Sequence, residues 1–289
     1  MIAILGGLGA AVAWAISTLC SSRSSRLIEP SSVVAWMMLV GLLITLPAAA
    51  LSGVPARLDA GSGAWLVLSG VGNVGGLVLT YSALRIGQVA LVAPLVSTEG
   101  AVAAIIAVVA GESLAPGVGL TLGAIVAGIW LASAPDRVAA TDRAPGPAGA
   151  PHPTRAVLLA MAAALAFGAS LYATGRAGEE LPASWVVLSA RAIGVVALAL
   201  PLALTRRLEI TRPAVPLVVA SGVCEVLGFF SYTAGARHSI AVAAVLASQV
   251  GGLAALGGYL IFDERLSRKR TLGVCTMLAG VAVLSALRA

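Results

Sequence analysis

Four polar or charged residues stand near the middle of segments that otherwise consist of Ala, Val, Leu, Ile and Gly: Asn73, Glu99, Arg191 and Glu225. A charged side chain at the centre of a lipid bilayer costs at least about 2.5 kcal/mol. Carboxylates bind and release protons, whereas a guanidinium stays charged at every accessible pH. This combination indicates that something polar is handled inside a membrane.

The charges do not balance one to one, because two acids share one fixed cation. Arg191 needs a partner at its depth, and only Glu99 and Glu225 are available there. We expect Arg191 to keep one acid ionised, while the other acid exchanges its proton for substrate. Two alternatives stay open: a purely structural ion pair, and protonated acids that serve helix packing.

Glu99 is the expected exchanging group, because its neighbours Ser97, Thr98 and Gly100 leave space and hydrogen bonds for a ligand. The neighbours of Glu225 are a cysteine and a valine. Other candidates are neutral polar residues, for which an interhelical hydrogen bond is the alternative role, and aromatic residues, for which anchoring at the membrane interface is the alternative. The predicted set is Glu99, Glu225, Arg191, Asn73, Gln249, Thr98, Ser97, Tyr81, Tyr232 and Trp14; it includes no catalytic residue, no metal ligand and no cofactor.

The composition is that of a membrane protein. Of the 289 residues, 59% are hydrophobic and only 10% are charged, and the mean hydropathy is +1.01. A soluble domain is about 25% charged. The net charge of +6 is spread over short connections, so it bears on membrane topology and does not indicate nucleic-acid binding. We expect a multi-pass protein of the cell (plasma or inner) membrane.

Ten apolar runs are long enough, or nearly so, to span a bilayer as helices, which takes about 20 residues each. The one long connection, 134–155, is rich in Ala, Pro and Gly and reads as a linker between two five-span halves, 1–133 and 156–289. The predicted fold is an all-α integral membrane protein with ten transmembrane helices. The runs are 2–20, 32–51, 63–84, 89–110, 118–133, 156–174, 184–204, 214–236, 240–262 and 271–287.

The two halves repeat short patterns in the same order. Thr-Tyr-Ser-Ala-Leu (80–84) is matched by Ser-Tyr-Thr-Ala-Gly (231–235), and Gly-Glu-Ser-Leu (111–114) by Asp-Glu-Arg-Leu (263–266). Because five is odd, two such halves in one membrane must run in opposite senses. Inverted repeats are typical of secondary transporters, whose substrate site lies near mid-depth.

With the stretches Trp-Ala-Ile-Ser (14–17) and Phe-Gly-Ala-Ser (167–170), these patterns resemble the EamA-type family of the drug/metabolite transporter superfamily. The resemblance implies ten helices in two five-helix repeats, and export or exchange of small metabolites, commonly coupled to protons. Many members carry a proline in the middle of both fourth-type spans. This chain has Pro94 in one and Val245 in the other, so we expect the two halves not to kink alike.

We therefore predict a secondary active transporter, a proton-coupled exporter or exchanger of a small polar metabolite such as an amino acid or a cationic compound. Its expected partners are that substrate, protons and lipid, without nucleic acid, in a monomer or weak homodimer. An intramembrane enzyme and a channel are the alternatives, although the sequence lacks His-Glu-x-x-His and Gly-x-Ser-x-Gly motifs. The Arg/Lys distribution favours termini outside the cell, whereas the family resemblance favours termini inside.

Overall fold

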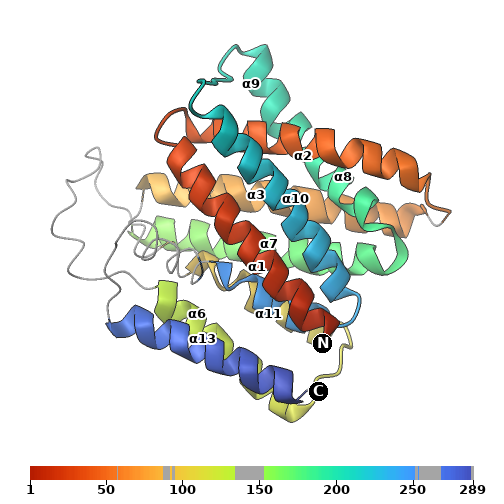
Figure 1. Ribbon diagram of the computed structural model, residues 1–289, viewed down its shortest axis with the longest axis vertical. Coiled ribbons are helices and arrows are strands. Elements are labelled where there is room, and N and C mark those ends of the chain that lie inside the picture. The colour runs from red at the N-terminus through yellow and green to blue at the C-terminus, as the bar shows by residue number, and fades with distance from the viewer. Residues whose placement is uncertain are drawn as a thin grey trace.

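The computed structural model describes residues 1–56, 58–86, 92, 95–133, 153–250, 253 and 268–287, and every regular element within them is helical. Figure 1 shows them as a bundle of long helices. The elements are α1 (Ile2–Ser24), α2 (Pro30–Ser52), α3 (Ala60–Ile86), α5 (Glu99–Val109), α6 (Pro116–Ser133), α7 (Pro153–Glu180), α8 (Ala183–Gly194), η1 (Val195–Ala199), α9 (Leu200–Leu204), α10 (Val215–Ala236), α11 (Ile240–Ala247) and α13 (Arg268–Leu287).

Six described helical segments are long and apolar enough to cross a membrane, and α5 and α6 are shorter apolar helices. A helix satisfies its own backbone hydrogen bonds, which lipid cannot do, so an apolar chain of this kind spans a bilayer as helices. The chain is thus a multi-pass membrane protein whose described residues form helices as their only regular elements. Six of the ten predicted spans correspond to these segments.

Helices from the two halves pack on each other in matching pairs. α1 packs on α10 and α3 on α7; α1 also contacts α11, and α7 contacts α5. α2 meets α10, and α3 meets α8, while α6 and α13 lie side by side (Figure 1). Each of these contacts recurs when the two halves are exchanged. The first and third helices of one half therefore form the main contacts with the third and first helices of the other.

Glycines permit the closest of these approaches. A Cβ on Gly6 of α1 would lie 2.5 Å from the Cα of Gly235 on α10. A Cβ on Gly72 of α3 would lie 2.7 Å from the backbone oxygen of Ala166 on α7. Small residues at helix crossings let backbones approach closely in membranes. Larger residues at these positions would separate the halves.

The fourth-type spans differ from the continuous runs 89–110 and 240–262 that the sequence predicts. Turns interrupt them at Ser97–Thr98 and at Ser248–Gln249. Thr98 N donates to Leu95 O at 3.2 Å, and Gln249 N donates to Leu246 O at 3.3 Å, so the helical ladder tightens in the same way at both places.

The expectation that the halves kink differently stays a prediction, but both spans break at matching positions although only one carries a proline. A hydroxyl bonds to the preceding turn in each break: Thr98 Oγ1 donates to Leu95 O, and Ser248 Oγ donates to Val245 O. Such bonds compete with the helical ladder and bend helices. Pro94, Glu264, and the glycines at 251 and 252 lie outside the described residues.

The seventh predicted span is also not a uniform α-helix. α8 continues into the π-helical turn η1 and then into α9, within one apolar segment 183–204. π-helical turns inside helices are rare, and those that occur often lie at functional sites. Arg191 lies one turn before this one, near the end of α8.

Candidate functional site

Arg191 is fully buried between α8, α2 and α10. Its Nη1 lies 3.7 Å from Glu225 Oε1 of α10 and 3.3 Å from Met38 Sδ of α2. The guanidinium carbon lies 4.7 Å from the centre of the Phe229 ring, a cation–π contact. At 3.7 Å the two charges attract without the direct hydrogen bond of a tight ion pair.

The side chain fits there because the neighbouring helix carries a glycine. A Cβ on Gly41 of α2 would lie 2.7 Å from Arg191 Cδ. In turn, a Cβ on Gly194 of α8 would lie 2.6 Å from Met38 Sδ. Arg191 and Met38 therefore each lie against a glycine of the opposite helix, at the place where the two halves meet.

Several buried polar atoms of the predicted residues have no hydrogen-bond partner within the described part of the chain. They are Arg191 Nε and Nη2, Asn73 Oδ1 and Gln249 Nε2. An unsatisfied buried polar group costs about 1–3 kcal/mol, and more if it is charged. Native structures keep few such groups, and each one needs an explanation such as a ligand, an ion or water. Three of the ten residues predicted from the sequence carry these atoms.

Glu99 is the first residue of α5, directly after the break in the fourth span. Its carboxylate is partly buried and close enough to Glu225 for the two to interact electrostatically. Negative charge is favourable in the first turn of a helix. A Cβ on Gly100 would lie 2.3 Å from Ser248 Oγ, so the two broken spans cross at their breaks. Glu99 and the break at Gln249 therefore lie at the same crossing of two helices.

The aromatic candidates pack mainly between helices. Trp14 Nε1 donates to the backbone oxygen of Glu225 at 3.4 Å, and its ring meets Phe229 edge-on at 5.1 Å. Tyr232 is buried, and its hydroxyl donates to Leu171 O at 2.8 Å, so that hydroxyl is used in a helix–helix bond. Tyr81 is partly buried and interacts electrostatically with Glu225.

Of the remaining predicted residues, Thr98 uses its hydroxyl to bond the preceding turn, as described above, and Ser97 is partly buried in the same turn. The structure thus brings Arg191 and Glu225 into contact, with Trp14 beside them. It brings Glu99 to the crossing of the broken spans. That Asn73, Glu99, Arg191, Glu225 and Gln249 share one central cavity stays a prediction.

The two halves use the same hydroxyl contacts to join their first and third helices. Ser17 of α1 donates to Ser221 O of α10 at 3.1 Å. With the halves exchanged, Ser170 of α7 donates to Ser69 O of α3 at 2.6 Å. The serine that accepts each of these bonds also uses its own hydroxyl, which bonds to a hydroxyl one turn further along the first helix. Ser221 Oγ lies 2.7 Å from Ser21 Oγ, and Ser69 Oγ lies 2.6 Å from Thr174 Oγ1.

The same correspondence pairs the central residues of the halves. Gly41 follows Met38 by three residues, as Gly194 follows Arg191, so Met38 and Arg191 occupy equivalent positions. Asn73 follows Ser69 by four residues, as Glu225 follows Ser221. One half therefore places a cation and an acid where the other places a thioether and an amide.

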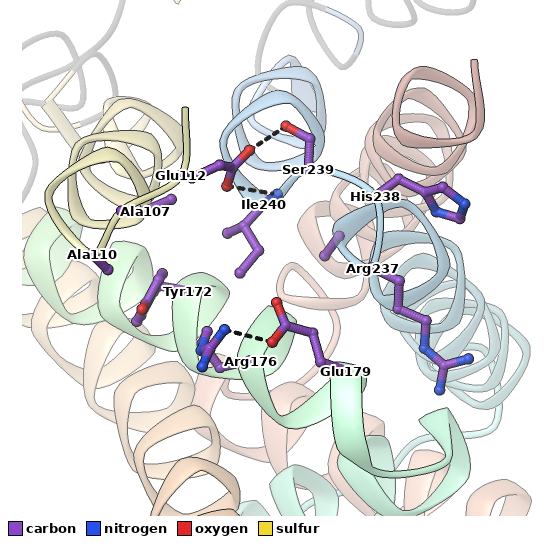
Figure 2. Close-up of a pocket in the computed structure, with 12 residues that line it drawn as sticks. Ala107, Ala110, Glu112, Tyr172, Arg176, Glu179, Arg237, His238, Ser239 and Ile240 are labelled. Atoms are coloured by element: carbon purple, nitrogen blue, oxygen red, sulfur yellow. Dashed lines mark hydrogen bonds and ion pairs between the residues drawn. The ribbon is translucent and has the colours of Figure 1, made fainter. Parts of the chain in front are cut away.

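A pocket of about 290 Å³ lies apart from these residues, where the ends of α5, α7 and α10 meet the start of α11 (Figure 2). Its lining includes Tyr172, Arg176, Glu179 and His238, and none of the ten predicted residues. Arg176 Nη1 and Glu179 Oε2 form a partly exposed ion pair at 2.5 Å, drawn as a dashed line in the figure. Polar and charged groups thus surround the opening of this pocket.

Glu112, at the edge of the same pocket, fastens one half to the other. Its carboxylate accepts hydrogen bonds from Ser239 Oγ at 2.5 Å and from Ile240 N at 3.1 Å (Figure 2), and a further one from Ala241 N at 3.2 Å. The amides of Ile240 and Ala241 are free backbone donors at the start of α11. The glutamate of the Gly-Glu-Ser-Leu motif is therefore a helix cap supplied across the two halves.

The sequence reasoning missed the pocket, because its lining comes from four helices far apart in the chain. The repeated Ser-x-x-x-Ser (17–21) and Ser-x-x-x-Thr (170–174) spacing was the available signal for the hydroxyl contacts. Residues four apart lie on one helix face, so both hydroxyls of each pair reach the same partner helix.

The model of the EamA-like transporter family matches residues 1–134 and 154–286, and the chain belongs to this family of membrane transporters of the drug/metabolite superfamily. No curated protein matches the chain. One similar solved structure, titled "Crystal structure of protein", is 21% identical, with a TM-score of 0.79 over 99% of this chain and 96% of that one. At this identity the likeness concerns the fold.

Proposed function

We propose that the protein is a proton-coupled secondary active transporter of a small polar metabolite, working as an exporter or exchanger in the cell (plasma or inner) membrane. The observation that carries this proposal is the group of buried, unpartnered polar atoms on Arg191, Asn73 and Gln249. A transporter binds its substrate at such atoms for part of its cycle and leaves them without partners for the rest.

The proposed architecture is ten helices in two inverted five-helix repeats. It is supported by the helix contacts, hydroxyl bonds and glycine contacts that recur when the halves are exchanged. In such transporters the repeats rock against each other around a site at mid-depth, built from discontinuous helices. The broken fourth-type spans, which meet at Gly100 and Ser248, supply the discontinuous helices here.

Glu99 is the proposed coupling group. Glu225 already has Arg191 as its cation, whereas none of the described residues forms an ion pair with Glu99. A carboxylate without a permanent cation can carry a proton in one half of the cycle and face a polar or cationic part of the substrate in the other. The inward movement of protons would then drive substrate outward.

The pocket beside Glu112 is the proposed approach to this site from one membrane face. It borders Tyr172, whose neighbour Leu171 accepts the hydrogen bond from buried Tyr232. Tyr232 in turn packs against Trp14, with ring centres 6.2 Å apart. This chain of contacts leads from the pocket towards Arg191 and Glu225.

The test is transport by purified protein in proteoliposomes under an imposed pH gradient. A thermal-stabilisation screen of amino acids and nucleobases first selects the substrate to be measured. Glu99→Gln should keep substrate binding and make it independent of pH, while gradient-driven transport falls at least about 100-fold, because a neutral amide carries no proton. Glu180→Gln, which removes an exposed acid at the end of α7, is the matched control and should transport normally.

Full proton-driven transport by Glu99→Gln would show that the coupling group lies elsewhere, with Glu225 next to be tested. Downhill flux that the pH gradient does not alter in the wild type would contradict proton coupling itself. Chemical conversion of the substrate during the assay would favour an enzyme over a transporter.

A further inference from the structure

The buried guanidinium of Arg191 has one occupied side and one free edge. On the occupied side, Nη1 faces Glu225 and Met38. On the other edge, Nε and Nη2 have no acceptor among the described residues, although the side chain is fully buried. These two nitrogens present parallel N–H donors, the arrangement that binds both oxygens of one carboxylate.

We propose that the Nε–Nη2 edge of Arg191 binds a carboxylate of the transported molecule, which makes the substrate a small carboxylic acid such as an amino acid. This inference rests on the proposed transport function and names the substrate class. A bidentate carboxylate satisfies both free donors at once, and a buried charge-assisted hydrogen bond is about twice as strong as a neutral one. A neutral acceptor with one oxygen would leave one donor unsatisfied.

Glu225 does not compete for this edge, because it sits at Nη1. Its 3.7 Å separation holds the guanidinium in position through charge and leaves the other nitrogens for a ligand. The Phe229 ring at 4.7 Å supports the flat face of the same group, and the contact of Gly41 with Arg191 Cδ limits its movement. A guanidinium fixed on one side and on its face is preorganised to receive a planar anion on its remaining edge.

The counterpart position in the other half argues against a purely structural arginine. Met38 occupies the equivalent place and packs against Gly194 much as Arg191 packs against Gly41. The helix crossing is therefore compatible with an uncharged side chain of similar length. A charge at only one of two equivalent positions fits a binding role better than a packing role.

The test uses acetate as the probe, because it is the smallest stable carboxylate, with acetamide as the neutral molecule of the same shape and sodium chloride as the ionic control. Protein with ¹⁵N-labelled arginine reports on each Nε–H group in solution, and Arg191→Lys assigns the Arg191 signal. Acetate should shift this signal saturably, while acetamide and chloride should not. Arg237 is the internal control, since its Nε already donates to the backbone oxygen of Gly178.

Two variants separate binding from folding. Arg191→Lys keeps the charge beside Glu225 but lacks the two parallel N–H donors of the guanidinium edge. Arg191→Met/Glu225→Asn gives the second half the residues that the first half has at the equivalent positions. Both should remain folded in thermal unfolding and lose the rise in Tm that acetate, but not acetamide, gives the wild type. Equal effects of acetate and acetamide on the wild-type Arg191 signal, or an undiminished acetate effect in the double variant, would overturn the proposal.

These binding measurements do not depend on transport. Acetate binding at Arg191 in a protein that moves no substrate would refute the proposed function and leave the carboxylate site in place. Transport of a substrate without a carboxylate, combined with no acetate response at Arg191, would refute the carboxylate site and leave the transporter.

Discussion

The centres of the two halves differ in chemistry although the frames around them match. In the second half Arg191 and Glu225 stand at the crossing of α8 and α10, and the equivalent residues of the first half are Met38 and Asn73. Around both centres, serine hydroxyls join the first and third helices and a glycine faces a side chain of the opposite helix.

This difference separates what holds the helices together from what the site does. Packing through small residues and hydroxyl bonds is the usual adhesive between helices in a membrane, where no hydrophobic force draws them together. These packing contacts and hydroxyl bonds occur in both halves, whereas the two charges occur only in the second. We therefore expect that the packing of the helices does not require the charges.

The largest expected effect comes from making the two centres alike. Arg191→Met alone leaves the partly buried Glu225 without its cation and should destabilise the protein by about 3–5 kcal/mol. Arg191→Met/Glu225→Asn removes both charges and should recover most of that stability, while substrate transport stays lost. Thermal unfolding in detergent and transport in proteoliposomes measure the two outcomes. A double variant as unstable as the single one would show that the frame does depend on the charges.

A smaller effect tests whether the frames are equivalent. A Cβ on Gly228 would lie 2.3 Å from Trp14 Nε1, and a Cβ on Gly76 would lie 2.6 Å from Phe167 Cδ1. Gly228→Ala and Gly76→Ala should therefore each lower stability by about 1–3 kcal/mol through overpacking. Gly75→Ala is the control, because its Cβ meets nothing within 4 Å. A clear loss for only one of the two glycines would mean that the aromatic contacts are not equivalent.

The smallest effect concerns the starts of the third helices, where the halves differ again. Ser62 N donates to Asp59 Oδ1 at 2.8 Å, and Asp59 N donates to Ser62 Oγ at 3.0 Å, which caps α3. No side chain caps α10. Hydrogen bonds from the Ser62 amide and hydroxyl lower the pKa of Asp59. Its stabilisation is thus complete above the unfolded pKa, about 3.9, and is lost as the pH falls through the lower folded value.

Hydrogen exchange of the first turns of α3 and α10 measures this effect. Acidification below about pH 4, near the ordinary pKa of an aspartate, should loosen the start of α3 and leave the start of α10 unchanged. Asp59→Asn should make α3 insensitive to pH in this range. An equal response of both helices would assign the pH effect to another group.

Much of this arrangement is readable from the sequence, because periodic apolar runs and repeated motifs determine where helices lie and which ones correspond. Charge counting also limited the partner of Arg191 to two acids, and the structure places Glu225 beside it. The breaks in the fourth-type spans were not predictable from proline, since Val245 stands where the other half has Pro94. At each break a hydroxyl, that of Thr98 or Ser248, donates to the preceding turn, and such bonds depend on side-chain rotamers.

The pocket beside Glu112 shows the other limit. Its walls combine residues far apart in the chain, such as Glu112 and Ser239, which are separated by 127 positions. Short motifs carry no information on which helix ends meet. The glutamate itself was visible in the repeated motif. Its role as a cap for a helix of the other half follows only from the fold.

The π-helical turn η1 records a difference in length between the repeats. Pro47 follows Gly41 by six residues in α2, whereas Pro201 follows Gly194 by seven, and η1 (Val195–Ala199) lies within the longer interval. One extra residue in an α-helix would rotate everything after it by about 100°. The wider π turn accommodates that residue, so the side chains before and after it keep their orientation around the helix axis. The span next to Arg191 thus holds one residue more than α2 over this interval, while the guanidinium keeps its contacts with Met38 and Glu225.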